Sequence, residues 1–144
     1  MDKPCCDVLL VEDLDNDFLL LSHEFERHTS MRVNRAQDGV EAIAYIQGQG
    51  KFADRRRFPF PQVLLLNLKL PRLDGFGVLR RLRANPHPRL TVIVLTGSQF
   101  PGDEQQARNL GAHEVFFKPS GLDELRQMIV NIEHCAMDLF AAAR

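Results

Sequence analysis

Two apolar runs constrain the fold of this chain more than any other feature. Residues 62–68 read QVLLLNL and residues 91–96 read TVIVLT, and each run is apolar along nearly its whole length. A strand with one face in water alternates apolar and polar residues, so strands like these are expected to be buried on both faces. That arrangement is typical of a parallel sheet with helices packed on each side.

The rest of the chain supplies the elements that such a sheet needs. Further strands are predicted at 6–12, 31–36 and 114–117, helices at 14–28, 39–49, 74–82 and 101–111, and a last helix beginning at a capping box made by Ser120 and Asp123. Segment 48–61 is predicted to be a long loop. We therefore expect an α/β fold: a doubly wound, five-stranded parallel sheet flanked by five helices, as one domain over residues 1–144 with its core at about 6–139.

Composition excludes several function classes. The formal net charge is −1, so no overall field recruits nucleic acid or an anionic membrane. No apolar stretch approaches the roughly 18 residues of a membrane span, and the first ten residues lack a signal-peptide layout, so a cytoplasmic protein is expected. The three cysteines and five histidines lack metal-ligand spacing, and no zinc site or disulfide framework is predicted.

Polar side chains stand at the predicted carboxyl ends of four strands. In open parallel sheets the functional site gathers beyond those ends, where the strand order reverses. The residues concerned are Glu12 and Asp13 after the first strand, Asn67 in the third, Thr96 in the fourth, and Lys118 after the fifth. Asn67 is the unexpected member, because an amide is a poor nucleophile, a poor base and a weak metal ligand.

Four spaced motifs carry a resemblance to a known family: VED at 11–13, NLKLPRLDG at 67–75, LTG at 95–97 and FKP at 117–119. With them the chain resembles, over about its whole length, the receiver domain of two-component response regulators. The resemblance implies a flavodoxin-like receiver fold with strand order 2-1-3-4-5 and a non-enzymatic role in phosphorelay signal transduction. The long loop at 48–61 and the absence of an output domain resemble the stand-alone subgroup that is paired with phytochrome-type or hybrid sensor kinases.

The resemblance also implies a metal site at the carboxyl ends of the strands. In the family, an aspartate at the end of the third strand takes a phosphoryl group from a kinase phosphohistidine, and Mg²⁺ assists. Asp13 would hold Mg²⁺ with help from Glu12, from the acceptor position Asn67 and from the backbone carbonyl of Lys69. Such hard oxygen ligands are what Mg²⁺ prefers.

Further roles carry over to the ends of the fourth and fifth strands. Thr96 and Lys118 would bind phosphoryl oxygens, and Pro119 would shape the next loop, commonly through a cis bond. Two positions depart from the family pattern. Asn67 replaces the acceptor aspartate, which removes a negative charge and should weaken Mg²⁺ binding. Val115 stands at the switch position, where the family usually carries a Tyr or Phe that follows Thr96.

Three functions remain open from the sequence. The first is an atypical receiver that is not phosphorylated at Asn67 and acts by protein–protein interaction. The second is an ordinary Mg²⁺-dependent phosphoacceptor, in which Asn67 is an engineered replacement of Asp or a neighbour such as Asp13 or Asp15 substitutes. The third is a flavodoxin-like cofactor binder, which would need a Gly/Ser/Thr-rich phosphate loop where this chain has EDLDND.

Partner surfaces follow from the same resemblance. A sensor histidine kinase or another signalling protein is the expected partner. A homodimer would use the face made by the fourth helix, fifth strand and fifth helix, and the candidate residues there are Gln105, Arg108, Phe116 and Arg126.

Overall fold

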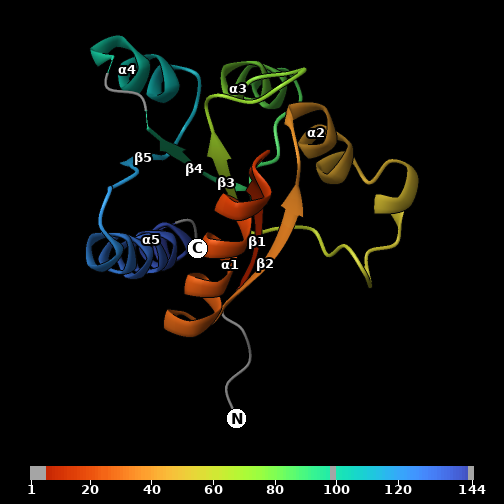
Figure 1. Cartoon of the computed structure of the whole chain (residues 1–144). Coiled ribbons are helices and arrows are strands. Elements are labelled where there is room, and N and C mark those ends of the chain that lie inside the picture. The colour runs from red at the N-terminus through yellow and green to blue at the C-terminus, as the bar shows by residue number, and fades with distance from the viewer. Residues whose placement is uncertain (1–5, 98–99, 143–144) are drawn as a thin grey trace.

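The computed structural model describes residues 6–97 and 100–142 (Figure 1). Five parallel strands form one sheet in the order β2-β1-β3-β4-β5. Their bounds are Cys6–Val11 for β1, Met31–Ala36 for β2, Val63–Asn67 for β3, Thr91–Thr96 for β4 and Glu114–Phe117 for β5. The predicted doubly wound sheet is confirmed, and so is the strand order that the family resemblance implied.

Helices cover both faces of this sheet (Figure 1). The α-helices are α1 Asp15–His28, α2 Gly39–Gln47, α3 Gly75–Ala84, α4 Pro101–Asn109 and α5 Leu122–Ala142. Helices α1 and α5 pack on one face, and α2, α3 and α4 pack on the other. Within the described residues, no helix combines the length and the apolar character that crossing a membrane requires.

The burial of β3 on both faces explains why its sequence is continuously apolar. Leu64 and Leu66 belong to the core beneath α2, α3 and α4, whereas Val63 and Leu65 belong to the core beneath α1 and α5. All four side chains are fully buried. Alternate residues of a strand point to opposite faces, so a strand with helices on both sides has no position left for a polar residue until its end.

Carboxylates cap the first turns of α2 and α3. The Asp38 carboxylate accepts the Glu41 N–H at 2.8 Å, and the Asp74 carboxylate accepts the Gly77 N–H at 2.8 Å, as N-caps do. The capping box predicted at Ser120 is wrong, because α5 begins at Leu122 and Ser120 lies one residue too early to cap it.

The predicted loop at 48–61 contains more structure than expected. It includes a 3₁₀ turn, η1, at Gly50–Ala53, and α2 ends at Gln47 because Gly48 adopts a left-handed conformation with φ 67°. The Arg55 guanidinium donates to the Tyr45 carbonyl at 2.8 Å and to the Ile46 carbonyl at 2.9 Å. The loop is therefore fastened to the C-terminal end of α2.

Candidate functional site

Four strands end at a pocket of about 330 Å³ at the carboxyl edge of the sheet. We call it the acid pocket, and it is defined by Glu12, Asp13, Asn67, Thr96 and Lys118. The structure brings together all five side chains that the sequence placed at strand ends. The pocket lies beside the point where the strand order reverses between β1 and β3, the usual site of function in such sheets.

Asn67 faces inward and acts as a hydrogen-bond donor. The residue is 4 % exposed. Its Nδ2 group donates to the backbone carbonyl of Val11 and, at 3.3 Å, to Glu12 Oε1. An ionised carboxylate accepts hydrogen bonds and has no proton to donate to either oxygen. Position 67 is therefore occupied by a hydrogen-bond donor in this structure.

The buried carboxylate of Glu12 is held by three donors. Its Oε1 atom accepts from Lys118 Nζ at 3.1 Å as well as from Asn67, and its Oε2 atom accepts the Leu14 N–H at 3.2 Å. A buried charge is costly unless it is paired and hydrogen-bonded. The ammonium, the amide and the backbone N–H meet that requirement without another ligand.

Asp13 and Asp17 differ from Glu12 in having no protein partner. Both residues line the acid pocket, and neither carboxylate makes a hydrogen bond or an ion pair with another described residue. Lys69 lines the same pocket, with its side chain exposed. Among the residues that the structure describes, no group of three or more His, Cys, Asp or Glu side chains could hold a metal ion.

Arg35 of β2 is a further site residue, which the sequence reasoning missed. Its Nε atom donates to the Glu12 carbonyl at 3.0 Å, and its Nη1 atom donates to Asp15 Oδ1 at 2.8 Å. The guanidinium carbon lies 4.8 Å from the centre of the Phe18 ring. Arg35 therefore fixes the acidic loop between β1 and α1. The strand-end rule that found the other residues would have found it too, had it been applied to the second strand.

Gly75 lets α3 begin against the pocket. Its N–H donates to the Leu68 carbonyl at 2.9 Å, and a Cβ atom built on it would lie 2.4 Å from the backbone oxygen of Asn67. Any larger residue would push the start of α3 away from the end of β3. Close packing of α3 against the end of β3 therefore requires a glycine at position 75.

A family model described as the response regulator receiver domain matches residues 8–130. The chain belongs to the response regulator receiver domain family. Receiver domains of this family are signalling domains of two-component systems, and they interact with sensor kinases or other signalling proteins.

Several response regulators are similar to this chain over most of its length. Response regulator Rcp1 of Synechocystis is 33 % identical over 88 % of this chain and 85 % of its own. The phosphorylated cyanobacterial phytochrome response regulator RcpA has a TM-score of 0.82 at 29 % identity, over 92 % of this chain and 94 % of its own. Response regulator RPA3017, described in red light signalling of R. palustris, has a TM-score of 0.82 at 35 % identity, over 89 % and 91 %.

Thr96 and Val115, the two residues that the family resemblance places at switch positions, are both buried. Thr96 is 3 % exposed and Val115 is 7 % exposed, and the Thr96 carbonyl accepts the Lys118 N–H at 2.8 Å. The peptide bond before Pro119 is trans, in contrast to the cis bond that the resemblance implied. Trans is the intrinsically favoured isomer by about 0.5–1 kcal/mol.

The predicted partner face contains three of its four candidate residues. Gln105 is exposed on α4, and Phe116 of β5 packs against the core beneath α5. Arg108 forms ion pairs with Glu104 and with Glu114, which tie α4 to β5.

The placement of Arg126 on that face is wrong. Its Nε atom lies 3.0 Å from Glu24 Oε2 on α1, so this residue faces the opposite neighbour of α5. The buried carboxylate of Glu24 attracts the guanidinium across the α1–α5 contact. About half a turn of helix, or roughly two residues, separates residues that face α1 from residues that face away from it, and the sequence alone did not fix that rotation.

Proposed function

We propose that this receiver domain signals without being phosphorylated at Asn67, by presenting a surface of fixed conformation to a partner protein. One observation carries the proposal: the Asn67 amide donates to the Val11 carbonyl and to Glu12, so the acceptor position is filled by a donor. The lysine that would meet a phosphoryl group is bonded to Glu12 instead. The Asn67 amide and the Glu12 carboxylate therefore already have hydrogen-bond partners within the protein.

The chemistry of an amide supports the same conclusion. The nitrogen lone pair of Asn67 is delocalised into the carbonyl, and the amide oxygen carries no formal charge. Neither atom is a nucleophile that could form an acyl phosphate with a phosphoryl donor. Transfer to Asn67 would also break the two hydrogen bonds that hold its side chain.

Val115 supports a surface that does not switch in the usual way. The side chain is buried against the core beneath α2, α3 and α4. It lacks a ring that could rotate between an exposed and a buried position, as the family's Tyr or Phe does. Coupling between Thr96 and the α4–β5 surface therefore has to follow another route or is absent.

The residues present fit Mg²⁺ in donor type but supply little charge. Asp13 would hold the ion through its unpartnered carboxylate, with the Lys69 carbonyl and the Asn67 amide oxygen completing a set of hard oxygens. When bound in a receiver, the ion spreads the charge of a transferring phosphoryl group. Glu12 is already paired with Lys118, so we expect weak Mg²⁺ binding.

We propose that this receiver domain contacts a sensor kinase or another signalling protein. Rcp1, RcpA and RPA3017 support this contact, because each is described as a response regulator and this chain resembles each over 85 % or more of its length. A homodimer through α4, β5 and α5 is the second contact that we propose. Phe117 and Leu122, which are 49 % and 47 % exposed, offer apolar area for a partner near that face.

A phosphoacceptor function remains the second candidate. It is favoured by the presence of Thr96 and Lys118 in one pocket, and by the unpartnered carboxylate of Asp13 at its wall. In this version either Asp13 accepts the phosphoryl group or Asn67 stands where the native chain has Asp. Asp15 is a poor substitute, because it is paired with Arg35 and does not line the pocket.

Incubation with acetyl phosphate and Mg²⁺, followed by intact-mass measurement, separates the two candidates. We expect the chain to gain no phosphoryl mass. The Asn67→Asp variant should gain one, because the rest of the pocket is present. Asp13→Asn in the native background is the matched variant for the substitute acceptor.

A phosphoryl adduct on the native chain that disappears in Asp13→Asn would establish the substitute acceptor and overturn our proposal. Failure of Asn67→Asp to gain mass, with the fold intact, would show instead that the pocket is not a competent receiver site. The native chain would then still be unphosphorylated.

A further inference from the structure

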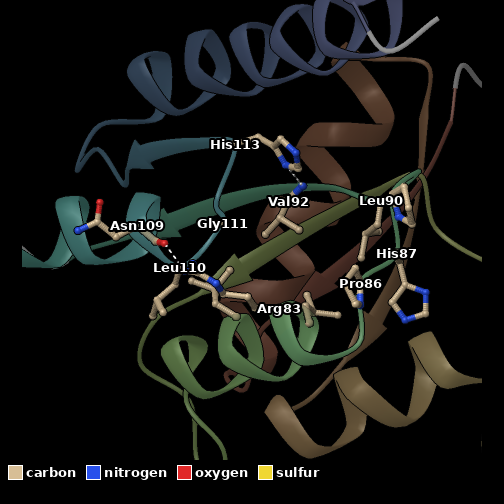
Figure 2. Close-up of a pocket in the computed structure, with 12 residues that line it drawn as sticks. Arg83, Pro86, His87, Leu90, Val92, Asn109, Leu110, Gly111 and His113 are labelled. Carbon is tan, nitrogen blue, oxygen red and sulfur yellow. Dashed lines mark hydrogen bonds between the residues drawn. The ribbon is translucent and has the colours of Figure 1, made fainter.

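A second pocket lies at the opposite edge of the sheet, between the C-terminal ends of α3 and α4 (Figure 2). We call it the α3–α4 groove. Its volume is about 430 Å³, which falls within the range of about 300–1,000 Å³ that is usual for small-molecule pockets. It shares no lining residue with the acid pocket.

The floor of the α3–α4 groove is apolar. Val92 comes from β4 and Leu90 directly precedes that strand. Leu79 and Leu82 come from α3, and Leu110 directly follows α4. Leu79, Leu90 and Val92 are part of the buried core, whereas Leu82 and Leu110 are only half-buried. The apolar part of a bound molecule could therefore cover Leu82 and Leu110, which are partly exposed to water.

Arg83 spans the groove from α3 to α4 (Figure 2). Its Nη1 atom donates to the Asn109 carbonyl at 2.7 Å, at the last residue of α4. A guanidinium carries five N–H donors, and the bond to Asn109 uses only one of them. The bond holds the cation in place, which lowers the entropy cost of using the remaining donors.

All ionisable side chains that line the groove are basic. They are Arg83, His87 and His113, and the adjoining hollow of about 310 Å³ beside His87 and Phe60 adds Arg89. The acid pocket at the other end of the strands has Glu12, Asp13 and Asp17 among its lining. The formal charge in the groove lining is therefore the cation of Arg83, whereas three of the five charged side chains that line the acid pocket are acidic.

His113 is fixed in a way that suits an anion. Its Nδ1 atom accepts the Val92 N–H at 2.9 Å, as Figure 2 shows. The neutral imidazole that accepts at Nδ1 carries its proton on Nε2, so the free side of the ring is a donor. Arg83 and His113 both line the groove and both carry hydrogen-bond donors.

We propose that the α3–α4 groove binds a small molecule that joins a carboxylate to an apolar body. The apolar part would lie on Leu82 and Leu110, and the carboxylate would accept hydrogen bonds from Arg83. Binding here goes beyond the proposed function and does not depend on the state of Asn67. It would give the receiver domain a ligand-responsive surface on α3 and α4.

The test uses three probes of the same shape: phenylbutyrate, phenylbutanol and phenylbutylamine. Each is titrated at neutral pH into the whole chain, and backbone amide NMR shifts are followed. We expect phenylbutyrate to shift the amides of Leu82, Val92 and Leu110, and to bind about fivefold more tightly than the alcohol. The amine should bind more weakly than either.

Arg83→Gln should remove the preference for the carboxylate while leaving the alcohol unaffected. Arg80→Gln removes the same charge from the exposed side of α3, outside the groove lining, and is the matched control. Equal binding of the three probes would overturn the proposal, and so would absence of shifts in the groove. Shifts confined to Lys118 and Thr96 would place the anion in the acid pocket and would also overturn it.

Discussion

Lys118 Nζ lies 3.1 Å from Glu12 Oε1, joining the ends of β5 and β1 across 106 residues of sequence. The carboxylate is 2 % exposed at its side chain and the lysine 29 %, so the pair is screened by water on one side only. Asn67 adds an amide proton to the same oxygen. The Glu12 carboxylate thus has its counter-charge and a second donor within the acid pocket.

Removing Lys118 should destabilise the fold. Lys118→Met leaves the buried Glu12 carboxylate without its positively charged partner. We therefore expect the free energy of unfolding to fall by about 1–3 kcal/mol. Urea unfolding at neutral pH measures the change. Lys69→Met is the matched control, since that lysine is exposed at the same edge and should change stability by no more than about 0.5 kcal/mol. Equal effects of the two substitutions would contradict the pairing.

Asn67→Asp should make the stability of the domain depend on Mg²⁺. A carboxylate at this position faces the Glu12 carboxylate and the Val11 carbonyl without a proton for either. In EDTA we expect a loss of about 1–3 kcal/mol, and Mg²⁺ should restore much of it by binding the folded state. Urea unfolding with and without Mg²⁺ reads the difference, and the native chain should respond much less.

The control for that substitution is Asn131→Asp on α5. It adds the same charge at an exposed residue whose side-chain oxygen already accepts from Gln127. If Asn67→Asp were as stable in EDTA as this control, the amide would not be serving as the donor that we describe.

The acid limb of the stability curve should depend on Arg126. Its hydrogen bond lowers the pKa of the Glu24 carboxyl below the ordinary value of 4.5, with burial opposing and the nearby His28 assisting. A lowered pKa stabilises the fold above pH 4.5, and that contribution is lost as pH falls through the lower value. Urea midpoints measured from neutral to acid pH should converge for the native chain and Arg126→Gln below pH 4.5. Arg27→Gln, an exposed change on α1, should not alter the curve.

The alkaline titration should reveal a single buried phenol. Tyr45 is the only tyrosine in the chain, and burial raises its pKa to about 12 from an ordinary 10.0. Its hydroxyl donates to the Pro59 carbonyl at 3.1 Å. Stability should therefore be retained up to pH 10 and decline as pH rises towards 12, where the unfolded chain ionises first. Ultraviolet absorbance and circular dichroism followed together test this, and ionisation near pH 10 in the folded chain would contradict it.

The fold could be predicted from the sequence because its signals are local. Continuous apolar runs such as 91–96 specify a strand buried on both faces, and a carboxylate such as Asp38 placed before an apolar helix face specifies a cap. Ser120 failed as a cap because Gly121 is equally able to precede a helix. A helix start one residue earlier or later leaves the core contacts of Leu125 unchanged.

The residues of the acid pocket could be predicted from the sequence, but their hydrogen-bond partners could not. Parallel strands bring their ends together, so the grouping of Asn67 with Lys118 follows from topology. The direction in which the Asn67 amide points does not, because it depends on which acceptors lie within 3.3 Å. Arg126 was misplaced for the same reason, since it pairs with Glu24 on another helix, whereas Arg35 was missed because the strand-end rule was not applied to the second strand.

The central claim is that a phosphoryl donor leaves the conformation of this receiver domain unchanged. Backbone amide NMR spectra of the native chain, with Mg²⁺ before and after addition of acetyl phosphate, test it most directly. We expect the spectra to superpose at Thr96, Val115 and the residues of α4, while the Asn67→Asp variant shifts at those positions. Donor-dependent shifts at these residues in the native chain would contradict the claim.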